Sequence, residues 1–213
     1  MKITIVYDNT VYKQGLKSDW GFSCVVEAEH APKILFDTGA NGMILLSNMK
    51  QLGIDPASIE TIIISHSHFD HTGGLSAFLN ANNEVDVYVP HSFRGLRGAR
   101  NVIHVSEPLE IHKNIFSTGE LSGIEQSIAI QSGKGLVVID GCSHPGVGSI
   151  LEAAEKHGTI HFLIGGLHGF NDFELLEKVD FVCPTHCTQH IQEIKNLYPE
   201  KYVEGGVGRI IEI

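Results

Sequence analysis

The chain has 213 residues, 42% of them hydrophobic and 19% charged, which is typical of a folded globular protein and excludes intrinsic disorder. The formal net charge of −10 argues against nucleic acid or an anionic membrane as the main partner. No apolar stretch approaches the roughly 18–20 residues of a spanning helix. The first residues do not resemble a signal peptide, and the four cysteines form no CxxC pair, so we expect a cytoplasmic protein with reduced thiols. The unusual feature is 13 histidines, because histidine is the commonest metal ligand.

The elements predicted in chain order begin as a run of strands and then alternate with helices. Strands are predicted at Ile3–Tyr7, Phe22–Glu27, Lys33–Phe36, Thr61–Ser65, Val85–Val89, Ser127–Gln131, Leu136–Asp140, Ile160–Ile164 and Phe181–Pro184. Helices are predicted at Met43–Leu52, Ser149–His157, Phe173–Val179 and Ile191–Leu197. This order favours an α/β fold in which two sheets carry helices on their outer faces. With no repeat or linker in sight, we predict one domain over residues 1–213.

A dense group of potential metal ligands directly follows the buried strand that is predicted at residues 61–65. His66, His68, Asp70 and His71 lie within six residues of one another. If the loop begins extended, His66 and His68 point the same way, because side chains repeat every two residues in a strand. Asp70 and His71 can then face a second position. Imidazole and carboxylate suit Zn²⁺, Fe or Mn²⁺, and the lack of thiolates in this set argues against a closed structural zinc site.

The HxHxDH motif resembles the signature of the metallo-β-lactamase superfamily, and further motifs follow in that family's order. These are FDTG at 36–39, GCSH at 141–144, GGLH at 165–168 and PTHCT at 184–188. The resemblance implies a four-layer αββα sandwich. Together the motifs look like a branch of metal-dependent hydrolases that includes the archaeal dihydropterin–ribofuranosylaminobenzene phosphate synthase.

The resemblance also implies roles for individual residues. It assigns His66, His68 and His144 to a first metal and Asp70, His71 and His186 to a second. Asp37 would support the metal loop from outside the coordination sphere, and His190 is a candidate for the same role or for a substrate contact. His168 falls near the position of the family's usual bridging Asp, where an imidazole would bind one ion only or lie outside the ligand set. The implied cofactors are two divalent ions, zinc in the first place, with iron or manganese as alternatives. The cysteines beside these motifs, Cys142, Cys183 and Cys187, are expected to be small buried residues.

Such a site predicts hydrolysis. A bound dication lowers the pKa of water from about 15.7 to about 7, and Asp70 would orient the nucleophile and carry its proton. Arg94, Arg97 and Arg100 form a basic cluster in an acidic chain. If that segment begins a helix, positions 94 and 97 share a face. We therefore expect a small anionic substrate held by these arginines, with a merely solvated basic turn as the alternative.

Three other functions remain open at this point. One is a transferase of the methanopterin type, which would displace pyrophosphate from a dihydropterin diphosphate. Another is a di-iron redox protein, although such relatives favour a carboxylate where this chain has His68. The third is a metal-binding module without activity, which a complete ligand set with open metal positions disfavours. The sequence does not determine the oligomeric state.

Overall fold

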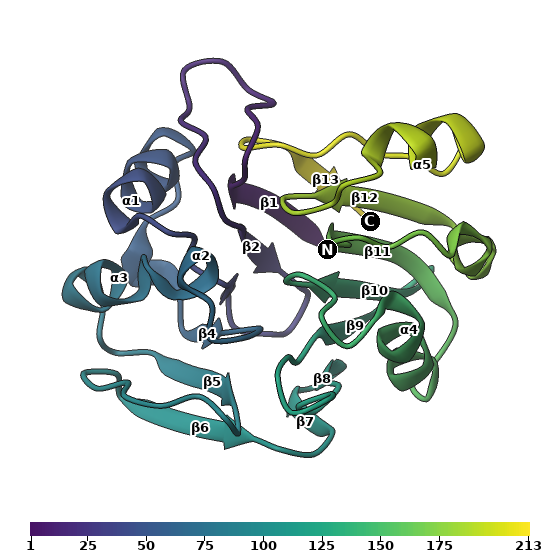
Figure 1. The fold of residues 1–213 in the computed structure, drawn as a ribbon. Coiled ribbons are helices and arrows are strands. Elements are labelled where there is room, and N and C mark those ends of the chain that lie inside the picture. The colour runs from purple at the N-terminus through teal and green to yellow at the C-terminus, as the bar shows by residue number, and fades with distance from the viewer.

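The computed structural model describes residues 1–213 and shows two β-sheets packed face to face between two groups of helices (Figure 1). The first sheet runs in the order β13 (Ile210–Glu212), β1 (Lys2–Tyr7), β2 (Ser23–Glu27), β3 (Ile34–Phe36), β4 (Thr61–Ile63), β5 (Asp86–Pro90) and β6 (Asn101–Val105). The second sheet runs in the order β12 (Phe181–Thr185), β11 (Ile160–Gly166), β10 (Gly135–Asp140), β9 (Ile128–Ser132), β8 (Ile115–Ser117) and β7 (Leu109–His112). Each sheet is antiparallel at one side and parallel at the other.

Helices cover the outer face of each sheet. The first sheet carries α1 (Gly42–Gln51), α2 (Phe69–Thr72) and α3 (Leu75–Ala81). The second sheet carries α4 (Val147–Glu155), the 3₁₀ segment η2 (Phe173–Lys178) and α5 (Ile191–Leu197), and a further 3₁₀ turn, η1 (Pro56–Ser58), precedes β4. No helix is both long enough and apolar enough to cross a membrane.

Alternation of side chains along the strands produces the four layers. In β1, Ile3 and Ile5 enter the core between the two sheets, whereas Val6 joins the core beneath α1 and α3. In β10, Val137 and Ile139 enter the same central core, whereas Val138 packs beneath α4. Since successive strand residues point to opposite faces, a strand buried on both faces is apolar throughout. The four-layer αββα sandwich is therefore confirmed.

Most of the predicted elements are present, and the differences occur where the sequence pattern is weak. In the segment predicted as a helix at 173–179, Phe173–Lys178 forms a 3₁₀ helix rather than an α-helix, and residues 93–100 form an irregular loop instead of beginning a helix. Strands β6, β7, β8 and β13 and the short helices α2 and α3 are absent from the predicted elements. Strands β6 and β7 have partly exposed patterns with charged or polar side chains, so their period is hard to recognise without their partners.

We predict that Ile139→Ala lowers the free energy of unfolding by about 2–5 kcal/mol, because a fully buried side chain leaves a cavity in the core shared by both sheets. Ile210→Ala is the matched control, since Ile210 is 46% exposed and loses little packing. Urea denaturation of the two variants measures the difference. Equal losses would contradict a single core between the sheets.

Candidate metal centre

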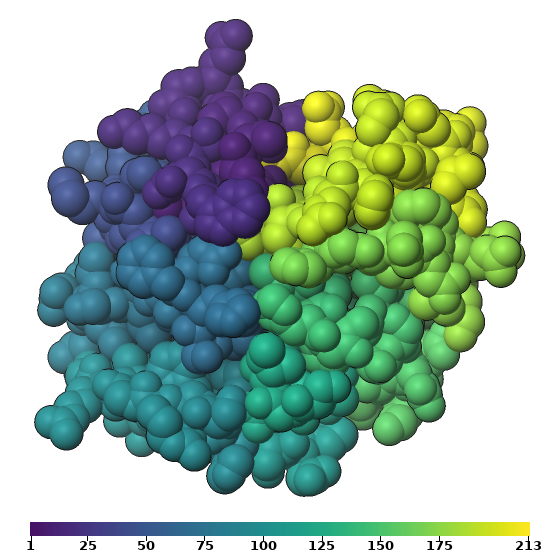
Figure 2. Space-filling model, in the orientation of Figure 1, coloured from purple at the N-terminus to yellow at the C-terminus, as the bar shows by residue number.

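Loops from both sheets meet at one edge of the sandwich, where parallel strands end. The strands β3 and β4 are parallel neighbours in one sheet, and β10, β11 and β12 are parallel neighbours in the other. Their carboxyl ends lie at the same edge, which is where open α/β sheets usually bind ligands. On the corresponding face, segments from the start, middle and end of the chain meet at the centre (Figure 2).

Four strand ends share an unusual backbone conformation. Asp37, Ser143, His168 and His186 follow β3, β10, β11 and β12, and all four have φ between 45° and 58°. A non-glycine residue rarely adopts this left-handed region, and such residues concentrate at functional sites. The conformation bends the chain sharply just where a side chain must turn back over the end of the sheet.

The structure brings His66, His68 and His144 together in one group of potential ligands. The Nε2 atom of His66 lies 3.1 Å from Nδ1 of His68, and the His144 ring centroid lies 4.8 Å from each of the other two. The Nε2 atom of His144 is buried without a hydrogen-bond partner. Buried polar atoms are almost always satisfied, so this orphan atom fits a missing metal ligand contact.

A second group contains Asp70, His71 and His186. The Nε2 atoms of the two histidines lie 3.3 Å apart, and Asp70 Oδ2 lies 3.2 Å from Nε2 of His186. Trp20, which the sequence did not indicate, donates its indole N–H to the same carboxylate oxygen at 2.8 Å. The hydrogen bond with His186 is the main cause that lowers the pKa of Asp70, so this carboxylate is ionised at neutral pH.

Asp37 lies on the Nδ1 side of the histidines, away from the converging Nε2 atoms, and orients one ligand in each group. Its carboxylate accepts hydrogen bonds from the backbone N–H and the hydroxyl of Ser65, and it lies 2.7 Å from Nδ1 of His71. The Ser65 hydroxyl in turn lies 2.9 Å from Nδ1 of His66. This network assigns the ring protons to Nδ1 and leaves Nε2 of His66 and His71 free to bind metal. Burial raises the pKa of Asp37 to about 8, and it lowers the pKa of both histidines, which therefore stay neutral.

His186 is held by the loop after β1, which sequence reasoning also missed. Asp8 accepts the backbone N–H of His186, and Asn9 Oδ1 lies 3.0 Å from its Nδ1 atom. Burial raises the pKa of Asp8 to about 6. One feature of the sequence could have indicated Asp8: it directly follows a strand, as the ligand motifs do.

Glu125 supports the loop after β10. Its fully buried carboxylate accepts the backbone N–H groups of Cys142 and His144 at 2.7 and 2.8 Å, and it lies 3.5 Å from Nδ1 of His66. Burial raises its pKa well above the usual range. Gly141 permits this close packing, because a Cβ there would lie 2.2 Å from the Ser65 hydroxyl.

Two thiols adjoin the histidines. Cys142 Sγ lies 3.2 Å from Nε2 of His71 and 3.2 Å from Cys187 Sγ, and both thiols are free. Their mutual hydrogen bond raises the pKa of Cys142 and lowers the pKa of Cys187 to about 6. Both residues are buried as expected, but they line the metal-ligand cluster instead of filling the core.

His168 and His190 lie outside the two groups. The ring of His168 is 5.2 Å from that of His144, its side chain is exposed, and it belongs to none of the groups whose ligand atoms converge. His190 pairs with Glu193 at 3.4 Å and packs edge-on against Phe173. Neither residue belongs to a group of converging ligand atoms in this structure, and their roles toward a metal stay predictions.

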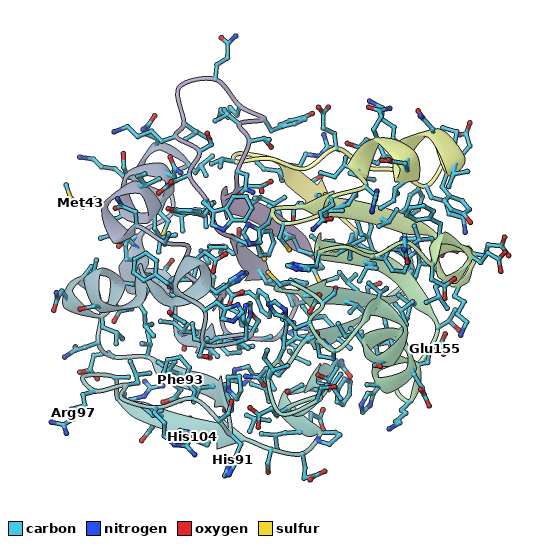
Figure 3. The ribbon with its side chains drawn as sticks, in the orientation of Figure 1. Met43, His91, Phe93, Arg97, His104 and Glu155 are labelled. Atoms are coloured by element: carbon cyan, nitrogen blue, oxygen red, sulfur yellow. The ribbon has the colours of Figure 1, made fainter.

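The three arginines do not line one common cavity. Arg100 is paired with Asp86 through two contacts of 2.8 and 2.9 Å. Arg94 and Arg97 line a cavity of about 480 Å³ that is also bounded by Thr72, the residue after His71. Figure 3 shows Arg97 directed outward at the edge of the molecule, with His91 and His104 also at the periphery. A second cavity, of about 540 Å³, lies beside His144 and His168.

Comparison with known proteins agrees with this geometry. The family model of the metallo-beta-lactamase superfamily matches residues 21–114, which include the first ligand motif. The 7,8-dihydropterin-6-methyl-4-(beta-D-ribofuranosyl)-aminobenzene-5'-phosphate synthase of Methanocaldococcus jannaschii is 28% identical over 94% of this chain and 91% of its own.

Solved structures share the whole fold. Tm1679, a metal-dependent hydrolase of the beta-lactamase superfamily, has a TM-score of 0.81 at 25% identity, covering 100% of this chain and 99% of that one. The short form of human tRNase Z, at 14% identity, shares the fold with a TM-score of 0.68, covering 100% of this chain and 99% of its own. The order of motifs, the sandwich and the convergent histidines have the same explanation: residues 21–114 match the metallo-β-lactamase superfamily, and the whole chain has the metallo-β-lactamase fold.

Proposed function

We propose that the protein is a hydrolase that uses two divalent ions, zinc in the first place and iron or manganese as alternatives, against an ester, phosphoester or related bond of a small anionic substrate. The observation that carries the proposal is the pair of ligand groups at the strand ends, one of which contains the orphan Nε2 atom of His144.

The ligand spacing fits this proposal. Two nitrogens bound to one tetrahedral zinc ion at 2.0–2.1 Å would lie about 3.3 Å apart. The observed nitrogen separations are 3.1 Å between His66 and His68 and 3.3 Å between His71 and His186. Ions held there would lower the pKa of water and polarise a carbonyl or phosphoryl oxygen of the substrate.

Asp70 is the residue that we assign to proton transfer. Its Oδ2 atom is fixed by the Trp20 indole and lies beside His186, and its low pKa keeps it ready to accept a hydrogen bond from water. A carboxylate in this position can orient an attacking water and take up its proton at a carboxylate oxygen.

Two cavities border residues of the ligand motifs, and we assign the substrate to them. The reacting bond would lie nearest to the cavity beside His144, whereas Arg94 and Arg97 bring positive charge to the rim of the cavity bounded by Thr72. Guanidinium groups recognise phosphate and carboxylate through charge-assisted hydrogen bonds, which supports an anionic substrate.

Transfer is the second candidate, and a specific observation favours it: the 28% identity with the archaeal synthase extends over nearly the whole chain. Incubation with a hydroxymethyl-dihydropterin diphosphate separates the two functions. A transferase releases pyrophosphate only when ribofuranosylaminobenzene phosphate is added, whereas a hydrolase acts without that acceptor. A screen of phosphoesters, thioesters and lactones with zinc, manganese and iron tests the hydrolase proposal directly.

We predict that the wild-type protein binds about two zinc ions per chain and that His144→Ala binds about one, because the first group loses its third ligand. Plasma emission spectrometry of gel-filtered protein measures the content. His104→Ala, a change of an exposed histidine in β6, is the control and should retain two ions. Full metal content in the His144 variant would refute this ligand assignment.

Asp70→Asn should lower kcat by about 10²- to 10⁴-fold with the best substrate from the screen, even in protein that is replete with metal, because the amide cannot accept a proton. Asp180→Asn changes an exposed carboxylate that pairs with His161 and should leave kcat unchanged. An Asp70 variant with wild-type kcat at full metal content would remove Asp70 from the mechanism.

Arg94→Ala and Arg97→Ala should each raise KM about tenfold to a hundredfold for an anionic substrate, because a charge-assisted hydrogen bond contributes roughly 1.5–3 kcal/mol. Arg100→Ala is the matched control, since its guanidinium already pairs with Asp86. If all three variants keep the wild-type KM, the cluster is a solvated turn.

A further inference from the structure

The ligand cluster lacks a carboxylate between its two groups. Asp70 lies in the second group, Asp37 faces the Nδ1 side of His71, and Glu125 is occupied by backbone N–H groups. The segment after β11 contributes Leu167 and His168, and the His168 side chain is exposed. Two dications a few ångströms apart repel each other strongly unless an anion lies between them.

The Cys142 sulfur occupies this intermediate place. It forms one group of potential ligands with His66 and His71, which belong to the first and the second group respectively. It forms another with His186 and Cys187. Its distance of 3.2 Å from Nε2 of His71 is close to the roughly 3.5 Å expected for nitrogen and sulfur on one tetrahedral zinc ion, given bond lengths near 2.0–2.1 and 2.3 Å.

The surroundings keep this sulfur in place. The Cys142 backbone N–H donates to Glu125, as does the backbone N–H of His144, so the same carboxylate fixes the backbone of both residues. The Cys187 sulfur lies 3.2 Å from Cys142 Sγ, within hydrogen-bonding distance.

We propose that Cys142 is a thiolate metal ligand lying between the two metal positions, where it supplies the negative charge that a bridging carboxylate would otherwise provide. The inference rests on the proposed metal centre. Binding breaks the S–H bond of Cys142, a metal–sulfur bond forms, and the proton leaves to solvent. No oxidation or reduction is involved.

Cobalt(II) substitution of the whole protein tests this ligand, because visible d–d bands report bound cobalt and a near-ultraviolet charge-transfer band reports cobalt–sulfur bonding. The wild-type protein should show both kinds of band. Cys142→Ser should keep the d–d bands and lose most of the charge-transfer intensity, whereas Cys187→Ala should keep at least half of it. Cys24→Ala, which changes a buried core thiol, should match the wild type.

X-ray absorption at the zinc edge gives a second readout that does not depend on activity. We expect a sulfur scatterer at about 2.3 Å in the wild type and in Cys187→Ala, and only nitrogen or oxygen scatterers in Cys142→Ser. Circular dichroism verifies that each variant is folded. Metal-loaded wild-type protein without sulfur scattering would overturn the thiolate ligand while leaving the metal centre intact. Loss of sulfur scattering in Cys187→Ala alone would overturn the assignment to Cys142, and failure to bind any metal would overturn the metal centre itself.

Discussion

One buried carboxylate, that of Asp37, determines the geometry of the candidate metal centre. It accepts hydrogen bonds from the backbone N–H and the hydroxyl of Ser65, and it is hydrogen-bonded to Nδ1 of His71. The Ser65 hydroxyl connects it to His66. It thereby joins the end of β3, the end of β4 and helix α2 in a single network. Two imidazoles in different ligand groups are oriented by the same carboxyl group, so a disturbance at Asp37 would reach both groups together.

The second sheet contributes through backbone strain. The residues after β10, β11 and β12 repeat the left-handed bend that Asp37 makes after β3. Such bends cost of order 1–3 kcal/mol each and persist only where the surroundings enforce them. Here Glu125 and Asp8 enforce two of them by binding the backbone N–H groups of His144 and His186. Buried acidic groups, which are costly for folding, thus position the imidazoles of the site.

The sequence was sufficient to predict the sandwich and the main ligand motif, because buried strands are continuously apolar and the HxHxDH spacing is dense. The sequence was not sufficient to predict that Trp20, Asn9 and Glu125 belong to the site, since each reaches it from a loop whose path depends on the tertiary fold. It also did not separate the roles of the arginines, because only the pairing of β5 with β6 places Asp86 beside Arg100. Residues 93–100 do not begin a helix, because Gly95 and Gly98 adopt positive φ, which an α-helix does not accommodate.

The contact between Trp20 and Asp70 gives the protein an intrinsic optical reporter. Trp20 is the only tryptophan of the chain, its side chain is 58% exposed, and its ring centroid lies 5.1 Å from that of His186. Indole emission responds to nearby charge and to changes in hydrogen bonding. The tryptophan fluorescence of this chain therefore originates from one residue at the mouth of the ligand cluster, so occupancy there can be followed in real time without a dye, a label or a known substrate.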